Sequence, residues 1–209
     1  MSEALRYHRA TNVEAGGTDE DEARTLETHP TAFKDYGDAE RVPLEASVAG
    51  AILGDGASVV RTATHRGWPG ERNIYFRGYS SAGALYPIEA YVAAPEALYS
   101  FDALTPALVR VGEGDARSAV AAAVGASADT FVVLTGVPSR TGWKYMERGY
   151  RHVWWDAGTM LANLLALAAA EGHEPRLYTA FVDAEVNDVL GIDGETEYAL
   201  ALLGLGAAA

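Results

Sequence analysis

The feature that most constrains the fold is a long apolar segment, residues 144–173, that is typical of one helix buried inside a domain. Small and apolar side chains recur there every three or four residues, and most faces carry little charge. A helix with this pattern must be covered on nearly every side. Gly172 and Pro175 mark its end, because glycine favours a left-handed cap and proline cannot continue the hydrogen-bond ladder. The segment therefore predicts a central helix that begins between Tyr145 and Arg151.

Four basic residues precede and open this helix, in a chain whose formal net charge is -13. They are Arg140, Lys144, Arg148 and Arg151. Cations near a helix N-terminus oppose the helix dipole by roughly 0.3–1 kcal/mol each, so helix stability does not explain them. The cluster indicates either an anionic ligand or a solvated basic turn that balances nearby carboxylates.

A second concentration of basic residues lies in segment 59–80, for which we expect an irregular loop because no hydrophobic period is visible. One basic loop rich in glycine and proline is usually exposed to solvent. Two in an acidic chain make a shared anionic ligand a reasonable hypothesis. The arginines of this segment are Arg61, Arg66, Arg72 and Arg77.

Length and composition indicate one α/β or α+β domain. The chain has 209 residues, of which 49% are hydrophobic, and we expect a single domain over 31–209 after a partly ordered arm over 1–30. Cysteine is absent from the sequence, which excludes disulfides and thiolate metal ligands and favours a reducing cytoplasm. The five histidines are scattered, so we expect no metal site.

Charge and hydropathy also limit the partners. The acidic balance argues against nucleic acid, because the overall field would repel a polyanion. The longest apolar run, 160–170, is interrupted by Asn163 and is too short to span a bilayer. Residues 1–10 lack the apolar core of a signal peptide. We therefore expect a cytoplasmic protein with neither a nucleic-acid nor a membrane partner.

Hydrophobic patterns and turn residues predict the order of the remaining elements. The run 131–137 is apolar and rich in β-branched residues, which is typical of a strand buried on both faces. The other expected elements are a helix over 46–53 that ends at Gly54, a strand over 88–93, a hairpin or loop over 95–112, a helix over 114–125, a strand over 177–182, a helix over 184–190 and a strand over 198–205.

Common motifs of nucleotide and hydrolase sites are missing from the sequence. It contains no phosphate-binding G-x-x-x-x-G-K-[ST] loop, no dinucleotide G-x-G-x-x-G after a strand, no H-E-x-x-H and no G-x-S-x-G elbow. Three features remain as candidates for a site. They are the small residues 80–84, where Ser81 offers a hydroxyl and a ligand could approach the backbone, the pair Lys144 and Tyr145, and the basic segments.

Three stretches of the sequence carry a resemblance to a known family. Residues 77–92, RGYSSAGALYPIEAYV, are similar to R-x-x-P-S-A-G-A-L-Y-P-x-E-x-Y, and 144–163 resemble K-Y-x-x-R-G-Y-R followed by E-A-G-H-x-x-Q-N. Residues 183–206 resemble a terminal L-G-(hydrophobic)-D-G-x-x-E segment with a closing strand, and 7–11 and 29–36 resemble amino-terminal pieces. Together they resemble the SagB-type dehydrogenase branch of the FMN-dependent nitroreductase family, which includes azoline oxidases of thiazole- and oxazole-forming peptide clusters.

The resemblance implies an α+β nitroreductase-like fold, with a central mixed or antiparallel sheet flanked by helices and a long buried central helix. It also implies a homodimer with two FMN sites at the subunit interface, where the central helix would face the partner. The implied reaction is flavin hydride transfer on a small molecule or a modified peptide, with NAD(P)H as a further candidate partner.

The resemblance also implies which residues hold the flavin. Ser81, Ala82 and Gly83 would line its ribityl chain and ring edge, and Thr179 and Ala180 fall where the family's Gly-Gly-Phe loop touches the isoalloxazine. The full implied cofactor-binding set is Arg77, Ser80, Ser81, Ala82, Gly83, Arg148, Thr179 and Ala180.

Lys144 and Tyr145 match the family's Lys-Tyr pair and are the implied catalytic residues. Oxidation of a thiazoline or oxazoline removes a ring proton while a hydride leaves for the flavin, so a Tyr or a desolvated Lys is a suitable base. The alternative is structural: Tyr145 packs under the helix and Lys144 lies on the surface.

The sequence departs from the family pattern in several places. The Arg-Arg-Ser-x-Arg motif that grips the FMN phosphate is absent between Pro43 and Arg77, so one of the four arginines of segment 59–80 would have to replace it. Ser80 replaces the signature's Pro, Asp156 its Glu, and Thr159 and Ala162 its His and Gln. Three functions remain open: an azoline oxidase-like dehydrogenase, an NAD(P)H-dependent nitro or quinone reductase, and a non-catalytic flavin- or partner-binding protein.

Overall fold

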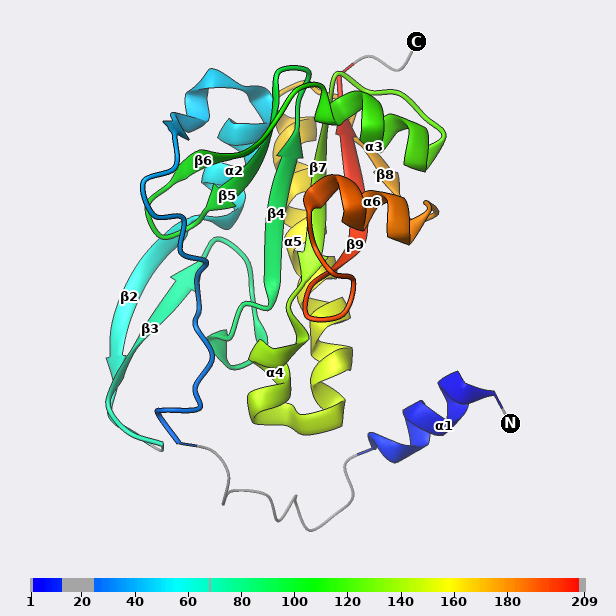
Figure 1. Cartoon of the computed structure of the whole chain (residues 1–209). Helices are drawn as coiled ribbons and strands as arrows, with labels where there is room; N and C mark the ends of the chain where they lie inside the picture. The colour runs from blue at the N-terminus through cyan, green and yellow to red at the C-terminus, as the bar shows by residue number, and fades with distance from the viewer. Residues whose placement is uncertain (1, 13–24, 68, 207–209) are drawn as a thin grey trace.

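A seven-stranded antiparallel sheet lies at the centre of the protein, as the computed structural model in Figure 1 shows. The structure describes residues 2–12, 25–67 and 69–206. The strand order is β1-β6-β5-β4-β7-β9-β8, and every neighbouring pair is antiparallel. The bounds are β1 Arg41–Val42, β4 Ile88–Ala93, β5 Ala97–Asp102, β6 Ala107–Glu113, β7 Thr130–Gly136, β8 Arg176–Tyr178 and β9 Tyr198–Leu205.

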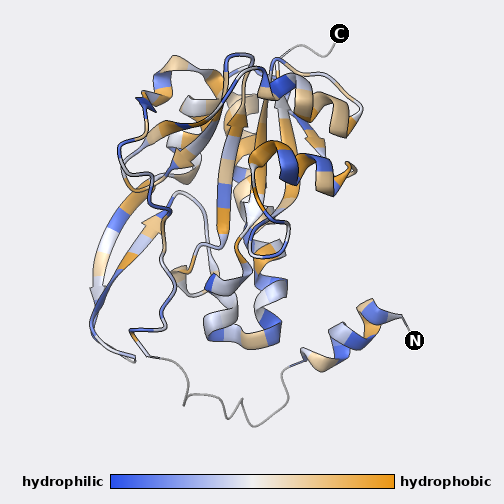
Figure 2. Cartoon of the chain, in the orientation of Figure 1, coloured by the Kyte–Doolittle hydropathy of each residue, from blue (hydrophilic) through white to orange (hydrophobic). Residues whose placement is uncertain are grey.

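Helices cover both faces of the sheet. Helices α2 (Val48–Ala57) and α5 (Gly149–Ala170) pack on one face, and α3 (Ala116–Val124) and α6 (Asp183–Leu190) pack on the other. A hydrophobic core lies on each face of the sheet. Strand β7 contributes side chains to both cores, because successive side chains of a strand point to opposite faces. Figure 2 shows hydrophobic residues concentrated along these central strands. The predicted α+β class is confirmed.

Helix α5 begins and ends close to the expected positions, but it is not buried on every side. Its buried face includes Met160 and Leu164, which pack against the sheet. Trp154 and Trp155 are 45% and 50% exposed on another face. The described residues of this one chain therefore leave part of the helix uncovered, and the predicted contact with a second subunit stays a prediction. Helix and strand periods reveal apolar faces, but they do not say whether the same chain or another covers them.

Helix α4 (Pro138–Tyr145) precedes α5, and a short 3₁₀ turn (Met146–Arg148) joins them. The backbone breaks at Met146, whose φ is 50°. By length and composition alone, the helical stretch Pro138–Ala170 is long and apolar enough to cross a bilayer, whereas the apolar run 160–170 is too short. In the structure the α5 part of this stretch packs on the central sheet.

The expected loop over 59–80 is wrong, because most of it forms a hairpin. Strands β2 (Val59–His65) and β3 (Arg72–Arg77) pair antiparallel as a separate two-stranded sheet that extends away from the main one. Both faces of β2 carry polar residues, such as Arg61, Thr62 and Thr64, so the strand shows no clear period of two. Arg61, for example, stacks on Phe76 across the hairpin.

Helix α2 continues past Gly54, so the predicted stop at that residue is also wrong. A Cβ at Gly54 would lie 2.8 Å from Leu44 Cδ1, and one at Gly50 would collide with the Leu44 backbone. These glycines therefore serve close packing rather than helix termination. The other predicted elements are confirmed, although β8 is shorter than the expected strand over 177–182.

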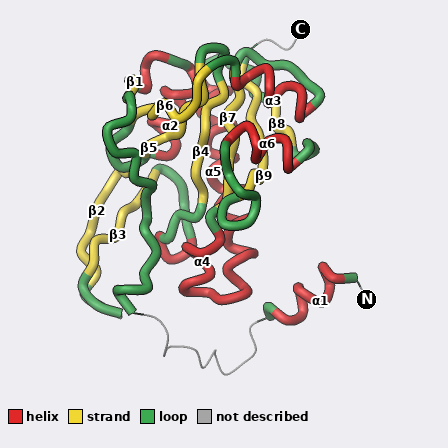
Figure 3. Tube along the Cα trace, in the orientation of Figure 1, coloured by secondary structure: helices red, strands yellow, loops and turns green. Residues whose placement is uncertain are grey.

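The N-terminal arm contains a short helix, α1 (Glu3–Ala10), and residues 25–40 form a long loop across the molecule (Figure 3). The Tyr7 hydroxyl donates to the Glu147 carbonyl at 2.8 Å, which docks α1 near the start of α5. Residues 1 and 13–24 of the predicted arm lie outside the described residues.

Candidate functional site

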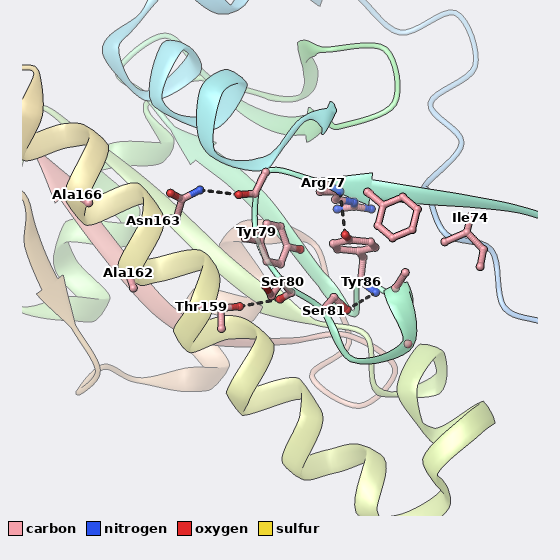
Figure 4. A pocket seen from close by; sticks show the side chains of 14 residues that line it. Ile74, Arg77, Tyr79, Ser80, Ser81, Tyr86, Thr159, Ala162, Asn163 and Ala166 are labelled. Atoms are coloured by element: carbon pink, nitrogen blue, oxygen red, sulfur yellow. Dashed lines mark hydrogen bonds between the residues drawn. The ribbon is translucent and has the colours of Figure 1, made fainter. Parts of the chain in front are cut away.

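An open cleft of about 850 Å³ lies between the end of β3, the loop that follows it, and the outer face of α5 (Figure 4). Its size falls within the usual range for ligand sites. Many of the side chains that line it are small, so the backbone is accessible. The lining residues are Ile74, Phe76, Arg77, Gly78, Tyr79, Ser80, Ser81, Gly83, Ala84, Tyr86, Thr159, Ala162, Asn163 and Ala166.

The loop of small residues has an unusual backbone. Gly83 has φ +63°, and the non-glycine residues Ala84 and Tyr86 have φ of 54° and 46°. Left-handed conformations at non-glycine residues cost free energy and occur preferentially at functional sites. The strained turn therefore supports the prediction that segment 80–84 forms part of a site.

A buried carboxylate on α5 holds this loop in place. Ser81 Oγ donates to Asp156 Oδ2 at 2.5 Å and accepts from the Tyr86 backbone N–H at 2.9 Å. The Ala82 N–H donates to Asp156 Oδ1 at 3.2 Å. Asp156, noted in the sequence only as a departure from the family pattern, thus orients the two predicted cofactor residues Ser81 and Ala82.

Lys144 and Tyr145 reach the same loop from the end of α4. A Cβ added to Gly83 would lie 2.9 Å from Tyr145 Oη and 3.1 Å from Lys144 Nζ. Both side chains are half-buried. The structure therefore brings the two predicted catalytic residues together with Gly83. Burial, with a smaller contribution from the charge of Asp156, raises the pKa of Tyr145, so its phenol is protonated at neutral pH.

His152 is a neighbour of this pair that the sequence interpretation missed. Its ring lies 4.1 Å from the Tyr145 ring, and Trp155 meets it edge-on at 4.9 Å between centroids. Burial and the nearby charge of Arg148 lower the pKa of His152, which favours the neutral imidazole. The sequence offered no signal for this contact, because a break in the helix separates the two residues.

Arg77 lines the cleft but is already engaged. Its guanidinium donates to the Ala32 carbonyl at 2.9 Å and to the Ile88 carbonyl at 3.4 Å, and it lies over the rings of Phe33 and Tyr86. Its side chain is buried, and its Nε has no hydrogen-bond partner. Arg77 therefore fits a role in holding the wall of the cleft better than one in gripping an anion.

The first basic cluster does not form one site. Arg140 Nη2 lies 2.5 Å from Glu89 Oε1 in an ion pair that is almost fully buried. Arg148 donates to the Thr11 carbonyl at 2.7 Å, and Arg151 donates to the His8 carbonyl, so both hold the N-terminal arm. The predicted cofactor contact at Arg148 is thus directed to the arm, and Lys144 is the member of the cluster that reaches the loop at Gly83.

Thr179 and Ala180 lie after β8, the strand at one edge of the sheet, and are not among the residues that line the cleft. Four of the predicted cofactor residues do line it, namely Arg77, Ser80, Ser81 and Gly83, and Ala82 belongs to the same turn.

The α5 wall of the cleft is formed by residues that the sequence interpretation did not assign to the site. Thr159, Ala162, Asn163 and Ala166 recur at steps of three and four. Thr159 Oγ1 donates to the Ser80 carbonyl at 2.8 Å, and Asn163 Nδ2 donates to the Gly56 and Gly78 carbonyls at 2.9 and 3.1 Å. A stripe of small and polar residues on an otherwise apolar helix was the available signal.

The stability of the fold should depend on pH through Asp156. Burial raises the pKa of this carboxyl even though Ser81 and Ala82 donate to it, so the folded state holds the proton more tightly than the unfolded state. The resulting stabilisation is complete below the unfolded pKa, about 3.9, and is lost as pH rises through the folded pKa. Relative to Asp156→Asn, the wild type should therefore lose unfolding free energy from about pH 4 upward.

Urea denaturation of both proteins at several pH values measures this difference. A difference that does not change with pH, or that grows as pH rises, would contradict the assignment.

The cleft fits one part of FMN better than the other. The absence of a Cβ at Gly83 and the small side chains of α5 leave room for a flat ring system next to the backbone. Among the residues that line the cleft, Arg77 is the one with a charged side chain, and it is engaged elsewhere. A phosphate would therefore need a cation from outside the lining. Within the described ranges, no group of three His, Asp or Glu residues is placed to hold a metal ion.

Comparisons with known proteins identify the family. The model of the nitroreductase family matches residues 48–207. A Methanocaldococcus jannaschii protein whose name assigns it to the nitroreductases is 30% identical over 142 residues, which cover 63% of this chain and 70% of that protein. The M. jannaschii relative and the solved structures described next point to the same family as the family model.

Two solved structures share the fold. One from Anabaena variabilis, described as a nitroreductase, has a TM-score of 0.84 and 27% identity; the match covers 97% of this chain but only 45% of that longer chain. The E. coli microcin synthetase McbBCD complex with truncated pro-MccB17 bound has a TM-score of 0.65 and 17% identity, with coverage of 98% and 82%. The match of the family model over most of the chain and this agreement in fold show that the chain belongs to the nitroreductase family.

Proposed function

We propose that the protein is an FMN-dependent oxidoreductase of the SagB-type branch, which oxidises azoline rings in a modified peptide or a related small molecule. The observation that carries the proposal is the approach of Lys144 Nζ and Tyr145 Oη to the position of a Gly83 Cβ, in the strained loop beside the cleft. A proton-transfer pair next to an accessible backbone turn is the arrangement that such a reaction requires.

FMN, when bound, would supply the hydride acceptor. The chain's own residues would position the substrate and move the proton. Asp156 fixes Ser81 and Ala82, and the strained turn presents Gly83 to the ring. Because the raised pKa of Tyr145 keeps its phenol protonated, Tyr145 would donate a hydrogen bond. Lys144, whose Nζ lies at the same turn, would be the group that takes the substrate proton.

The proposal includes a homodimer. Trp154 and Trp155 are large and about half exposed on α5, next to the small residues that line the cleft. Exposed aromatic side chains are enriched where proteins associate. A second copy of the chain would cover this face and close the open side of the cleft. The fold that the chain shares with the McbBCD complex, solved with truncated pro-MccB17 bound, is compatible with a peptide substrate.

A second candidate function is NAD(P)H-dependent reduction of a nitro or quinone compound. The protonated phenol of Tyr145 favours it, because reduction needs a proton donor rather than a base. The name of the M. jannaschii relative points the same way.

Flavin absorbance of the purified protein tests both candidates. We expect protein that carries FMN or takes it up, that is bleached under anaerobic conditions by an azoline-containing peptide, and that responds slowly to NAD(P)H. Rapid bleaching by NAD(P)H with no response to the peptide would support the reductase instead. Colourless protein that FMN cannot reconstitute would contradict both enzymatic functions and support the non-catalytic alternative.

A further inference from the structure

We propose that Arg61 is the residue that recognises the phosphate of the flavin in this chain, in place of the missing arginine motif. This inference rests on the proposed FMN site and adds to it the identity of the cation that selects a phosphorylated flavin. The lining of the cleft lacks an available cation, so a cation for the phosphate would have to come from the strands that border the cleft.

Arg61 lies on the face of the β2–β3 hairpin that forms the border of the cleft. It pairs in register with Phe76 on β3, and its Cζ lies 3.8 Å from the centre of the Phe76 ring. Phe76 lines the cleft, as does Ile74 two positions earlier on the same strand face. The guanidinium thus lies over an aromatic ring that forms part of the cleft wall.

The other arginines of the hairpin have other contacts. Arg66 Nε lies 3.1 Å from Glu71 Oε2, and Arg77 is buried with its guanidinium on two backbone carbonyls. Arg72 pairs with His65 at the far end of the ladder from Phe76. Arg61 is exposed, and no carboxylate of the described residues forms an ion pair with it.

The charge of Arg61 also acts on the cleft. Although burial raises the pKa of Tyr86 overall, the positive charge of Arg61 works in the opposite direction on this phenol, which lines the cleft. Arginine offers a planar fork of donors that matches a phosphate, and hydrogen bonds of this kind are stronger than neutral ones. In a chain of net charge -13, an unpaired exposed arginine beside a cleft is a selective contact for an anion.

The recognition of phosphate can be separated from the recognition of the ring by comparing FMN with riboflavin. We expect wild-type protein to bind FMN at least about ten-fold more tightly than riboflavin, because a charge-assisted contact contributes at this level. Arg61→Gln should remove most of this preference, because it should weaken the binding of FMN and leave the binding of riboflavin unchanged. Arg61→Lys should retain part of the preference. Arg66→Gln, on the same hairpin, is the matched control and should leave the preference unchanged.

Quenching of flavin fluorescence on titration gives both dissociation constants for each protein, and the FMN affinity should fall more steeply with salt than the riboflavin affinity. An equal loss of affinity for both flavins in Arg61→Gln would overturn the inference, since it would show that the residue only packs on Phe76. An unchanged preference in that variant would also overturn it while leaving the FMN site intact. Failure of wild type to bind either flavin would overturn the proposed function together with this inference.

Discussion

Replacing Lys144 by Gln and Tyr145 by Phe together should lower the rate of flavin-dependent turnover by about 10²- to 10⁴-fold, the usual contribution of general acid–base groups. Both polar atoms lie at the Gly83 turn, and neither substitution shortens the side chain enough to open a large cavity. Phe at position 145 keeps the aromatic contact with His152. The effect should therefore appear in the rate constant for the chemical step and leave the affinity for FMN within a few-fold.

Single-turnover bleaching of the bound flavin measures this rate directly. Tyr150→Phe is a suitable control, because Tyr150 is an exposed tyrosine at the start of α5 whose ring contacts Tyr7 and Trp154 rather than the cleft. It should turn over like wild type. Unchanged turnover in the double variant, or an equal loss in Tyr150→Phe, would remove the proposed role of the pair.

Arg140→Met should destabilise the fold by about 3–5 kcal/mol, because it leaves the buried carboxylate of Glu89 without its partner. The two side chains are each 4% exposed and 2.5 Å apart. Arg140 also donates to the Tyr86 carbonyl at 2.8 Å, so its loss should loosen the segment that carries the strained turn.

Urea denaturation measures the change, and a double-mutant cycle isolates the pair. Arg140→Met combined with Glu89→Leu removes both charges and should be markedly more stable than Arg140→Met alone, since a buried pair can often be replaced by apolar side chains at little cost. If the double variant is as unstable as the sum of its parts, the ion pair is not the source of the effect.

The main sheet and the helices that cover it could be predicted from the sequence because their hydrophobic periods are strong. The β7 run around Phe131 is continuously apolar, and α5 repeats apolar residues every three to four positions. The β2–β3 hairpin could not be predicted in this way. Strand β2 carries polar residues on both faces, such as Arg61, Thr62 and Thr64, and stacking across the hairpin, as between Arg61 and Phe76, supplies a contact that apolar pairs supply elsewhere.

The candidate site could likewise be predicted from the sequence only in part. The turn around Gly83 and the pair Lys144 and Tyr145 could be named from motifs, and the structure brings them together. The basic residues that precede and open α5 are close in the sequence, but this closeness did not predict a shared site, because a helix directs successive side chains to different surroundings. Arg140 thus points to a buried carboxylate and Arg148 to the N-terminal arm. Only the packing of the whole chain separates them.

FMN titration of wild type, of Ala162→Phe and of Ala169→Phe tests most directly whether the cleft beside α5 is the flavin site. Both alanines are exposed on α5, but only Ala162 lines the cleft. We predict that wild type and Ala169→Phe bind one FMN per chain with similar affinity. Ala162→Phe should remain folded but lose about 100-fold or more in its affinity for FMN, as expected when a bulky ring blocks a ligand site. Binding of FMN by Ala162→Phe with the affinity of wild type would contradict the account.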